Sequence, residues 1–145
     1  MAHIVRDMTY ISRCGNHYRN EKLEPLGLTG RQAGSILVIC NNPGISQDQL
    51  GKRVVLNKSN ITRQLTFLEE KGYVNRVVSP TDKRVLQLYP TQKALDILPQ
   101  IRQVYHDWRC YLLADISEED QALLESLLER VKEKAYTWMD GGADL

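Results

Sequence analysis

The sequence predicts a mainly α-helical fold with a small β-hairpin wing: a winged helix-turn-helix flanked by helices at both chain ends. Three observations support this fold class. Two short amphipathic helices are expected within residues 46–70, and two β-rich segments joined by a turn follow within residues 73–89. The segments on either side carry helical apolar periodicity. A helix, a turn, a second helix and a hairpin, in this order, form a layout that is typical of reading duplex DNA.

The first helix of the pair is expected to begin at Ser46. Gln49 follows three residues later, so the two side chains can form a capping box in which each satisfies a backbone N–H. The helix carries Leu50 and Val54 inward and should end near Val55. This prediction rests on local residue types alone.

The second helix carries a clear apolar stripe. Ile61, Leu65 and Leu68 recur at helical spacing, so the opposite face is left to short polar side chains and an arginine. Asn57 or Ser59 can cap its start, and Gly72 is expected to end it as the residue just past the C-cap. The first two turns of the outward face therefore suit base edges and phosphates.

A hairpin is expected next. Residues 73–78 and 84–89 are rich in β-branched and aromatic residues, and residues 79–83 have turn chemistry. Lys83 and Arg84 lie at its tip, where a basic loop can enter a minor groove. The alternative is that these two residues only make a turn more soluble, and the helix pair directly upstream argues against it.

Charge is concentrated in the same stretch. The chain of 145 residues has a formal net charge of only +1, but residues 52–84 hold eight basic and three acidic side chains. Residues 115–145 hold three basic and nine acidic ones. A positive field confined to the helices and hairpin is expected where phosphates bind.

Composition excludes several other classes. No apolar run approaches the roughly 18 residues of a membrane span, and Arg6, Asp7 and Arg13 lie where a signal peptide would be apolar, so we expect a cytoplasmic protein. Three widely spaced cysteines do not predict a disulfide framework. We find no phosphate-binding glycine loop, nucleophile elbow or HExxH motif, so an enzyme is not expected and no cofactor is implied.

The flanking segments are expected to be amphipathic helices that associate. A helix is predicted over residues 3–24, one opens at the Thr29 capping box, one runs from Thr91 toward Leu113 with a bend at Pro99, and one begins at Ser117. We assign residues 1–28 and 91–145 to dimerisation and residues 29–90 to the winged helix-turn-helix. A second copy should cover the apolar faces, since exposed ones associate; the alternative is a monomer folded over its winged unit.

Five segments of the chain form a recognisable set: Gly27-Leu28-Thr29 with Gln32, residues 46–56, the run LTFLEEKG at 65–72, Asp82-Lys83-Arg84 and Pro90-Thr91. Through them the chain resembles the multiple-antibiotic-resistance regulator (MarR) family of winged-helix transcription factors along nearly its whole length. The resemblance implies a homodimer on a pseudo-palindromic operator, usually acting as a repressor, with Asp82 orienting an arginine of the wing or a neighbour. It further implies phosphate contacts from Ser46 and Gln47, and a minor-groove contact from Arg84. The expected DNA-contacting residues are Ser46, Gln47, Lys58, Ser59, Asn60, Thr62, Arg63, Gln64, Arg76, Asp82, Lys83 and Arg84.

The resemblance also implies a small-molecule effector held between the dimer helices and the winged domain. Five side chains on the expected helices would wall such a pocket, although aromatic residues at helical spacing are more often core or interface. They are Tyr10, His17, Tyr18, Tyr105 and Trp108.

Three alternatives remain open from sequence. One is thiol-redox sensing, for which no basic group near Cys14 predicts a thiolate. Another is a zinc site, since Cys14 and His17 on one helix, with His106 and Cys110 on another, have the right composition. The third is a winged helix used only for protein contacts, which would not need the basic segment. No metal is predicted.

Overall fold

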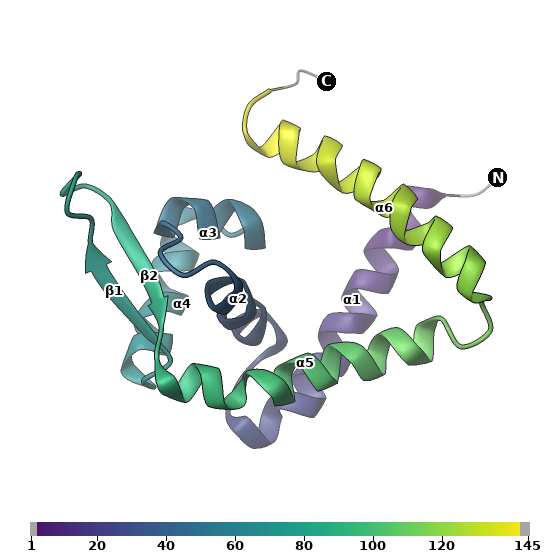
Figure 1. Ribbon diagram of the computed structural model, residues 1–145, viewed down its shortest axis with the longest axis horizontal. Coiled ribbons are helices and arrows are strands. Elements are labelled where there is room, and N and C mark those ends of the chain that lie inside the picture. The colour runs from purple at the N-terminus through teal and green to yellow at the C-terminus, as the bar shows by residue number, and fades with distance from the viewer. Residues whose placement is uncertain (1–2, 143–145) are drawn as a thin grey trace. The chain divides into compact units, whose positions relative to one another are not determined.

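The computed structural model describes residues 3–142, and these form helices and one hairpin (Figure 1). Residues up to Trp108 make one compact unit and those from Arg109 onward a second. The elements are α1 (Ile4–Leu23), η1 (Glu24–Leu26), α2 (Gly30–Asn41), α3 (Gln47–Val54), α4 (Lys58–Glu70), β1 (Val74–Val78), β2 (Leu86–Pro90), α5 (Gln92–Leu112) and α6 (Glu118–Met139). The mainly helical fold with a two-stranded hairpin is the one that the sequence predicts.

Helix starts follow the capping residues. Thr29 and Ser46 each form a complete capping box, with reciprocal hydrogen bonds to Gln32 and Gln49. Of the two caps considered for α4, Asn57 is the one used, and its side chain accepts the backbone N–H of Asn60 at 2.9 Å. Short-range chemistry therefore fixes where both helices of the helix-turn-helix begin.

Helix α4 ends at a glycine in the left-handed conformation. Gly72 has φ of +82°, and its N–H donates to the carbonyl of Glu69 at 3.0 Å. The N–H of Tyr73 donates to the carbonyl of Leu68 at 2.9 Å, which completes a Schellman motif. This motif turns the chain directly into β1, so the recognition helix and the wing are joined by a defined corner.

The hairpin pairs β1 with β2 in antiparallel register, with Arg76 opposite Leu88 and Val78 opposite Leu86. The other edge of β2 is also bonded, because the N–H of Leu88 donates to the carbonyl of Ile45 at 2.9 Å. The second strand begins at Leu86 rather than at Arg84 as expected. The reason is that the Ser79 N–H bonds the Val85 carbonyl at 2.8 Å, which leaves residues 80–84 as the wing loop.

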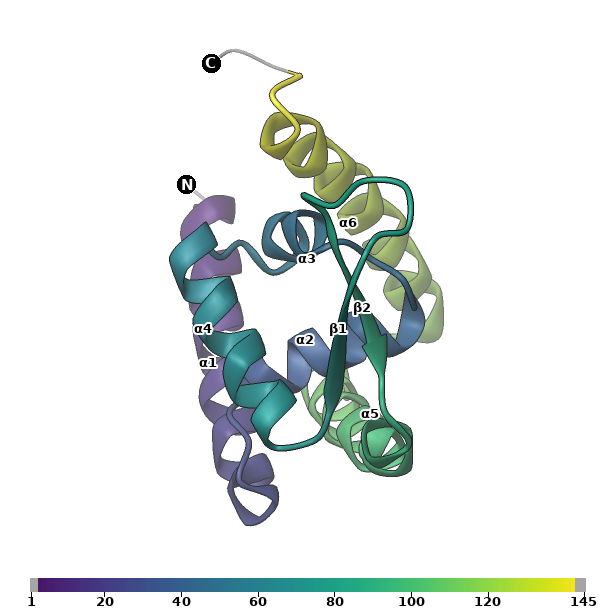
Figure 2. The ribbon, with the colours of Figure 1, turned by 90° about the vertical axis from the view of Figure 1, so that its left-hand side faces the viewer.

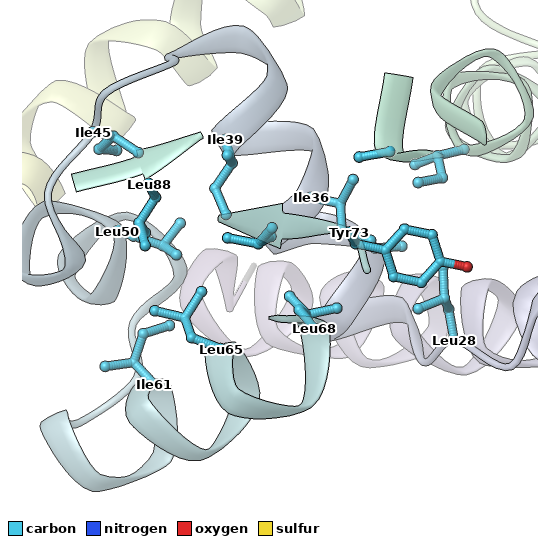
Figure 3. Close-up of a cluster of buried hydrophobic side chains, with 14 of the residues drawn as sticks. Leu28, Ile36, Ile39, Ile45, Leu50, Ile61, Leu65, Leu68, Tyr73 and Leu88 are labelled. Atoms are coloured by element: carbon cyan, nitrogen blue, oxygen red, sulfur yellow. The ribbon is translucent and has the colours of Figure 1, made fainter. Parts of the chain in front are cut away.

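One apolar core supports the helix-turn-helix and the wing (Figure 3). Leu50 of α3, Leu65 of α4 and Leu88 of β2 are fully buried, together with Ile36 of α2. The three α4 residues of the predicted stripe point into this cluster in Figure 3. Burying one face of α4 leaves the opposite face in solvent, which positions the site described below.

The helices after the wing differ from this pattern. Thr91 caps α5, since its hydroxyl accepts the N–H of Ala94 at 3.3 Å, and Pro99 lies within the helix. Ser117 caps α6 in the same way through the N–H of Asp120. No residue within Glu118–Met139 is buried. Among the described residues, no helix is long and apolar enough to cross a membrane.

Candidate nucleic-acid interface

The first half of α4 presents an exposed polar and basic surface. Lys58, Ser59, Asn60 and Arg63 are all exposed, and they belong to a helix whose other face is buried in the core. Figure 2 shows α4 and the hairpin on the same side of the winged unit. We call these four residues together with Lys83 and Arg84 of the wing the reading surface. A guanidinium, an amide and hydroxyls in this arrangement can hydrogen-bond base edges and phosphates.

Gln47 and Thr62 tie α3 to α4. The Gln47 Nε2 donates to the Thr62 hydroxyl at 2.9 Å, and that hydroxyl donates to the Lys58 carbonyl at 2.8 Å. The Gln47 Oε1 is buried and has no hydrogen-bond partner among the described residues. Ser46 is half-buried, and its hydroxyl already accepts the Gln49 N–H. These predicted contact residues therefore hold the helix pair in place within the free protein.

The wing loop is ordered by two networks of hydrogen bonds. Asp82 accepts the Arg84 side chain through Nε at 3.1 Å and Nη2 at 3.2 Å, and the Arg84 backbone N–H at 3.0 Å. The hydrogen bonds from Arg84 hold the pKa of the Asp82 carboxyl below its usual value. Because 90% of the Arg84 side chain is exposed, the pairing orients this guanidinium outward without covering it.

The second network centres on Ser79, which sequence reasoning treated only as part of a turn. Ser79 is buried, and its hydroxyl accepts the backbone N–H groups of Thr81 at 3.3 Å and Asp82 at 3.4 Å. A serine before a proline in a turn is the signal that could have shown this role. Ser79 thus fixes the backbone from which Asp82 and Arg84 project.

Two predicted contact residues have partners inside the winged unit. Arg76 forms a bidentate pair with Glu69, at 3.0 Å and 3.3 Å, and only 19% of its side chain is exposed. These hydrogen bonds lower the pKa of the Glu69 carboxyl, despite partial desolvation. Gln64 is half-buried, and its side-chain oxygen accepts a hydrogen bond from Ser35 of α2. We therefore leave both outside the reading surface.

Three of the five residues expected at an effector pocket make aromatic contacts between α1 and α5. Tyr18 and Trp108 stack on each other, with ring centroids 5.0 Å apart, and the Arg19 guanidinium lies over the Tyr105 ring at 4.9 Å. Burial raises the pKa of the Tyr105 hydroxyl. The Tyr10 side chain is 70% exposed. Tyr18, Tyr105 and Trp108 therefore contribute to the packing of α1 against α5.

A cavity of about 660 Å³ lies instead between α1, the start of α2 and the end of α3. His17 is the only one of the five expected residues that lines it. No acidic side chain contributes, and the Arg19 Nε is buried there without a hydrogen-bond partner among the described residues. The lining that defines its chemistry comes from Arg13, His17, Arg19, Arg31, Val54 and Val55. We call this cavity the α1–α3 pocket.

The cysteines and histidines form no metal cluster in the described part of the chain. Within residues 3–142, no three His, Cys, Asp or Glu side chains are placed to share a metal ion. A tetrahedral zinc site needs four such ligands at one point. Burial raises the pKa of the Cys40 thiol, which favours the unreactive protonated form.

The fold and the reading surface define a winged helix-turn-helix protein, and comparisons with known proteins agree. The MarR family model matches residues 31–86. A crystal structure of MarR is 30% identical, with a TM-score of 0.81 over 92% of this chain and 98% of its own. The transcriptional regulator YybA of Bacillus subtilis is 26% identical over 91% of this chain and 88% of its own.

A third match is a MarR-family regulator from Listeria monocytogenes, solved in complex with a 26mer DNA. It is 25% identical, with a TM-score of 0.88 over 100% of this chain and 99% of its own. The chain belongs to the MarR family. It is therefore a transcriptional regulator of the winged-helix class and not an enzyme.

Proposed function

We propose that this regulator binds duplex DNA, with α4 in the major groove and the wing arginine in the minor groove. The observation that carries the proposal is the division of α4 into a fully buried face and an exposed face of lysine, serine, asparagine and arginine. The Listeria relative was solved with a bound 26mer DNA, which supports DNA binding by this chain. Ser46 and Gln47, at the start of α3, and Thr62 would add contacts at the edge of this surface.

We further propose a homodimer formed by residues 1–28 and 91–145, with residues 29–90 reading DNA. The supporting observation is the exposure of large apolar side chains on α6, where Val131 is 48% and Trp138 53% exposed. Helical faces of this kind associate in water. A two-fold dimer would place two copies of α4 on an inverted repeat with half-site centres about 10 base pairs apart.

As a dimer on a promoter in the cytoplasm, the protein would act as a repressor by occupying DNA that the polymerase needs. An effector would enter the α1–α3 pocket, which borders both a dimerisation helix and the end of α3. Its arginines and its lack of acidic side chains favour an anion. In a transcription assay, the protein should lower transcription from the promoter it binds; higher transcription would identify an activator instead.

The direct test is selection of DNA fragments from the source genome by the purified protein, followed by footprinting. We expect a protected inverted repeat whose affinity falls steeply with salt concentration, because phosphate contacts release counterions. A fragment of scrambled sequence and equal length is the control. Equal retention of both fragments at every salt concentration would contradict sequence-specific binding.

The symmetry of the complex is tested on the same fragment. Five base pairs inserted at the centre of the repeat turn the half-sites to opposite faces of the duplex, so specific binding by a two-fold dimer should be lost. An insertion of ten base pairs restores the face and serves as the matched control for lengthening. Unchanged affinity for the five-base-pair insertion would refute the symmetric arrangement.

A further inference from the structure

The three backbone carbonyls that follow α4 all accept hydrogen bonds from the start of α5. The Lys93 Nζ donates to the Lys71 carbonyl at 2.6 Å, and the Thr91 hydroxyl donates to the Gly72 carbonyl at 2.5 Å. The backbone N–H of Thr91 donates to the Tyr73 carbonyl at 3.1 Å. We call these contacts of Thr91 and Lys93 the corner clamp, because they hold the corner at which α4 turns into the wing.

Thr91 contributes to the corner clamp at the point where the chain changes direction. It is the one residue between the end of β2 at Pro90 and the start of α5 at Gln92. While its hydroxyl donates to the Gly72 carbonyl, the same oxygen accepts the backbone N–H of Ala94 at 3.3 Å. A hydroxyl can donate and accept at once. Thr91 therefore caps α5 and attaches it to the end of α4 with one side chain.

Lys93 supplies a second point of attachment, two residues further along. Its Nζ lies 4.5 Å from the centroid of the Tyr73 ring, and this tyrosine is buried. An ammonium group is favoured both by an aromatic face and by the negative end of a helix, here the C-terminus of α4. One attachment would leave α5 free to rotate about it, whereas two attachments fix its direction.

Apolar packing alone would not fix that direction. Ala94 and Ile101 of α5 are fully buried, in the same core cluster as Leu65 and Leu68 of α4. Burial of apolar surface is favourable over many arrangements, because the hydrophobic effect is non-directional. Hydrogen bonds require a narrow range of distance and angle. The core therefore presses the start of α5 against the winged unit, and the corner clamp sets the angle between α5 and α4.

We propose that Thr91 and Lys93 are positioning residues for operator spacing: they fix the angle between α4 and α5, and with it the separation of the two recognition helices in the dimer. The inference rests on the proposed function, in which residues 91–145 contribute to the dimer and residues 29–90 bind DNA. One base pair added between half-sites moves them apart by about 3.4 Å and turns them by roughly 35°. A dimer with the clamp intact cannot follow this change, whereas a dimer with a loosened clamp can.

Thr91→Asp separates the clamp from the helix cap. A carboxylate is a good N-cap and still accepts the Ala94 N–H, but it has no proton to donate to the Gly72 carbonyl. Thr91→Ser keeps both hydrogen bonds. Lys93→Met keeps an unbranched side chain and removes the ammonium group. Gln92→Ala is the matched control, because the Gln92 side chain lies in the same turn and bonds Asp96 of the same helix.

The measurement is the affinity of each full-length variant for two DNA fragments. One is the operator that the wild-type dimer retains, and the other has one base pair inserted between the half-sites. Thr91→Asp should bind the operator roughly 5- to 20-fold more weakly, and Lys93→Met roughly 2- to 5-fold more weakly. Their affinity for the lengthened operator should change by no more than about twofold, so both variants lose preference for the native spacing. Thr91→Ser and Gln92→Ala should match wild type on both fragments.

Hydrogen exchange distinguishes the corner clamp from the cap. The Ala94 amide, which bonds the residue 91 side chain, should keep its protection in Thr91→Asp. The amide of residue 91, which bonds the Tyr73 carbonyl, should lose protection in the same variant. In Thr91→Ser both amides should be protected as in wild type. Unchanged protection of both amides in Thr91→Asp would show that the hydroxyl does not hold the corner, which overturns the proposal.

Three binding results would also overturn it. Equal losses of affinity on both fragments would show that Thr91 contributes to stability and not to spacing. A loss in Thr91→Ser as large as in Thr91→Asp would show that the donated hydrogen bond is not what matters. If Thr91→Asp does not fold, Lys93→Met decides, and a wild-type preference for spacing in that variant overturns the proposal.

Failure of this inference is distinguishable from failure of the proposed function. A wild-type protein that retains no duplex at any salt concentration overturns the proposed function. A wild-type dimer that prefers the native spacing, with the same preference in Thr91→Asp and Lys93→Met, overturns this inference alone. Equal wild-type binding to both fragments also overturns it, because no spacing preference is then left for the corner clamp to set.

Discussion

Helices α4 and α6 carry similar apolar stripes, but the side chains of the two stripes are buried to very different extents. In α4, Ile61, Leu65 and Leu68 are at most 2% exposed, because α2, α3 and the wing supply their partners. In α6, Leu127 is 45% and Val131 48% exposed, and no residue of the helix is buried. The comparison teaches that an apolar periodicity specifies a helix face but not what covers it.

Stability should show the largest difference between the two helices. Leu65→Ala removes a fully buried side chain from the core, so it should lower the free energy of unfolding by about 2–5 kcal/mol. Leu127→Ala on α6 should cost less, and its cost should depend on protein concentration if a second copy covers this face. Urea denaturation at two protein concentrations measures both effects. Equal, concentration-independent costs would remove the distinction drawn here.

Association should depend on the stripe of α6. Leu127→Glu combined with Val131→Glu places two charges on the exposed apolar face and should convert the proposed dimer to monomer at micromolar concentration. Light scattering after size-exclusion chromatography gives the mass. Ser126→Glu, which adds a charge on the opposite side of the same helix, is the matched control. A dimer that survives the double substitution would place the interface elsewhere.

Substitutions on the exposed face of α4 should separate sequence reading from phosphate binding. Arg63→Ala should cost about 1–3 kcal/mol on the operator and relax preference at one base position per half-site. Lys58→Ala should weaken operator and random DNA alike and reduce the salt slope by about one unit per lost contact. Titrations on both duplexes at several salt concentrations distinguish the two. Similar losses on both duplexes for Arg63→Ala would mean that this arginine does not read bases.

The wing should contribute a smaller and sequence-dependent share. Arg84→Ala should lose affinity mainly where the flanks are rich in A·T pairs, because a narrow minor groove attracts an inserted guanidinium. Binding to two operators that differ only in their flanks measures this. Lys83→Ala is the neighbouring control, expected to act equally on both. Equal effects of Arg84→Ala on the two operators would contradict a minor-groove role.

The ion pair between α4 and β1 should give the smallest effect, and one that depends on pH. Arg76 holds the pKa of the Glu69 carboxyl below its usual value near 4.5. A depressed pKa in the folded state means that the pair stabilises the protein above that value and that the stabilisation is lost as pH falls through the folded pKa. Glu69→Gln should therefore be slightly less stable than wild type at pH 7, and the difference should disappear as pH falls through the folded-state pKa of Glu69. A difference in Tm that stays constant over this range would contradict the assignment.

Local features of the fold could be predicted from the sequence because they depend on residues within a few positions of each other. Capping boxes at Thr29 and Ser46, the glycine that ends α4 and the apolar stripe of α4 all have this property. The exposed half of α4 followed from the same periodicity. The hairpin was predicted as well, although its second strand begins two residues later than expected.

Only the tertiary structure decided which side chains meet across elements. Gln64 was expected to face outward, but its side chain accepts a hydrogen bond from Ser35 of α2. Arg76 was expected to contact DNA, but its side chain hydrogen-bonds to Glu69, seven residues earlier in the chain. The aromatic residues of α1 and α5 pack on each other while a basic cavity forms elsewhere. Periodicity gives the face on which a residue lies, whereas its partners depend on how distant segments pack. The left-handed conformation of Val55 arises in the same way, because it follows from joining α3 to α4 over Gly51 and not from any preference of valine.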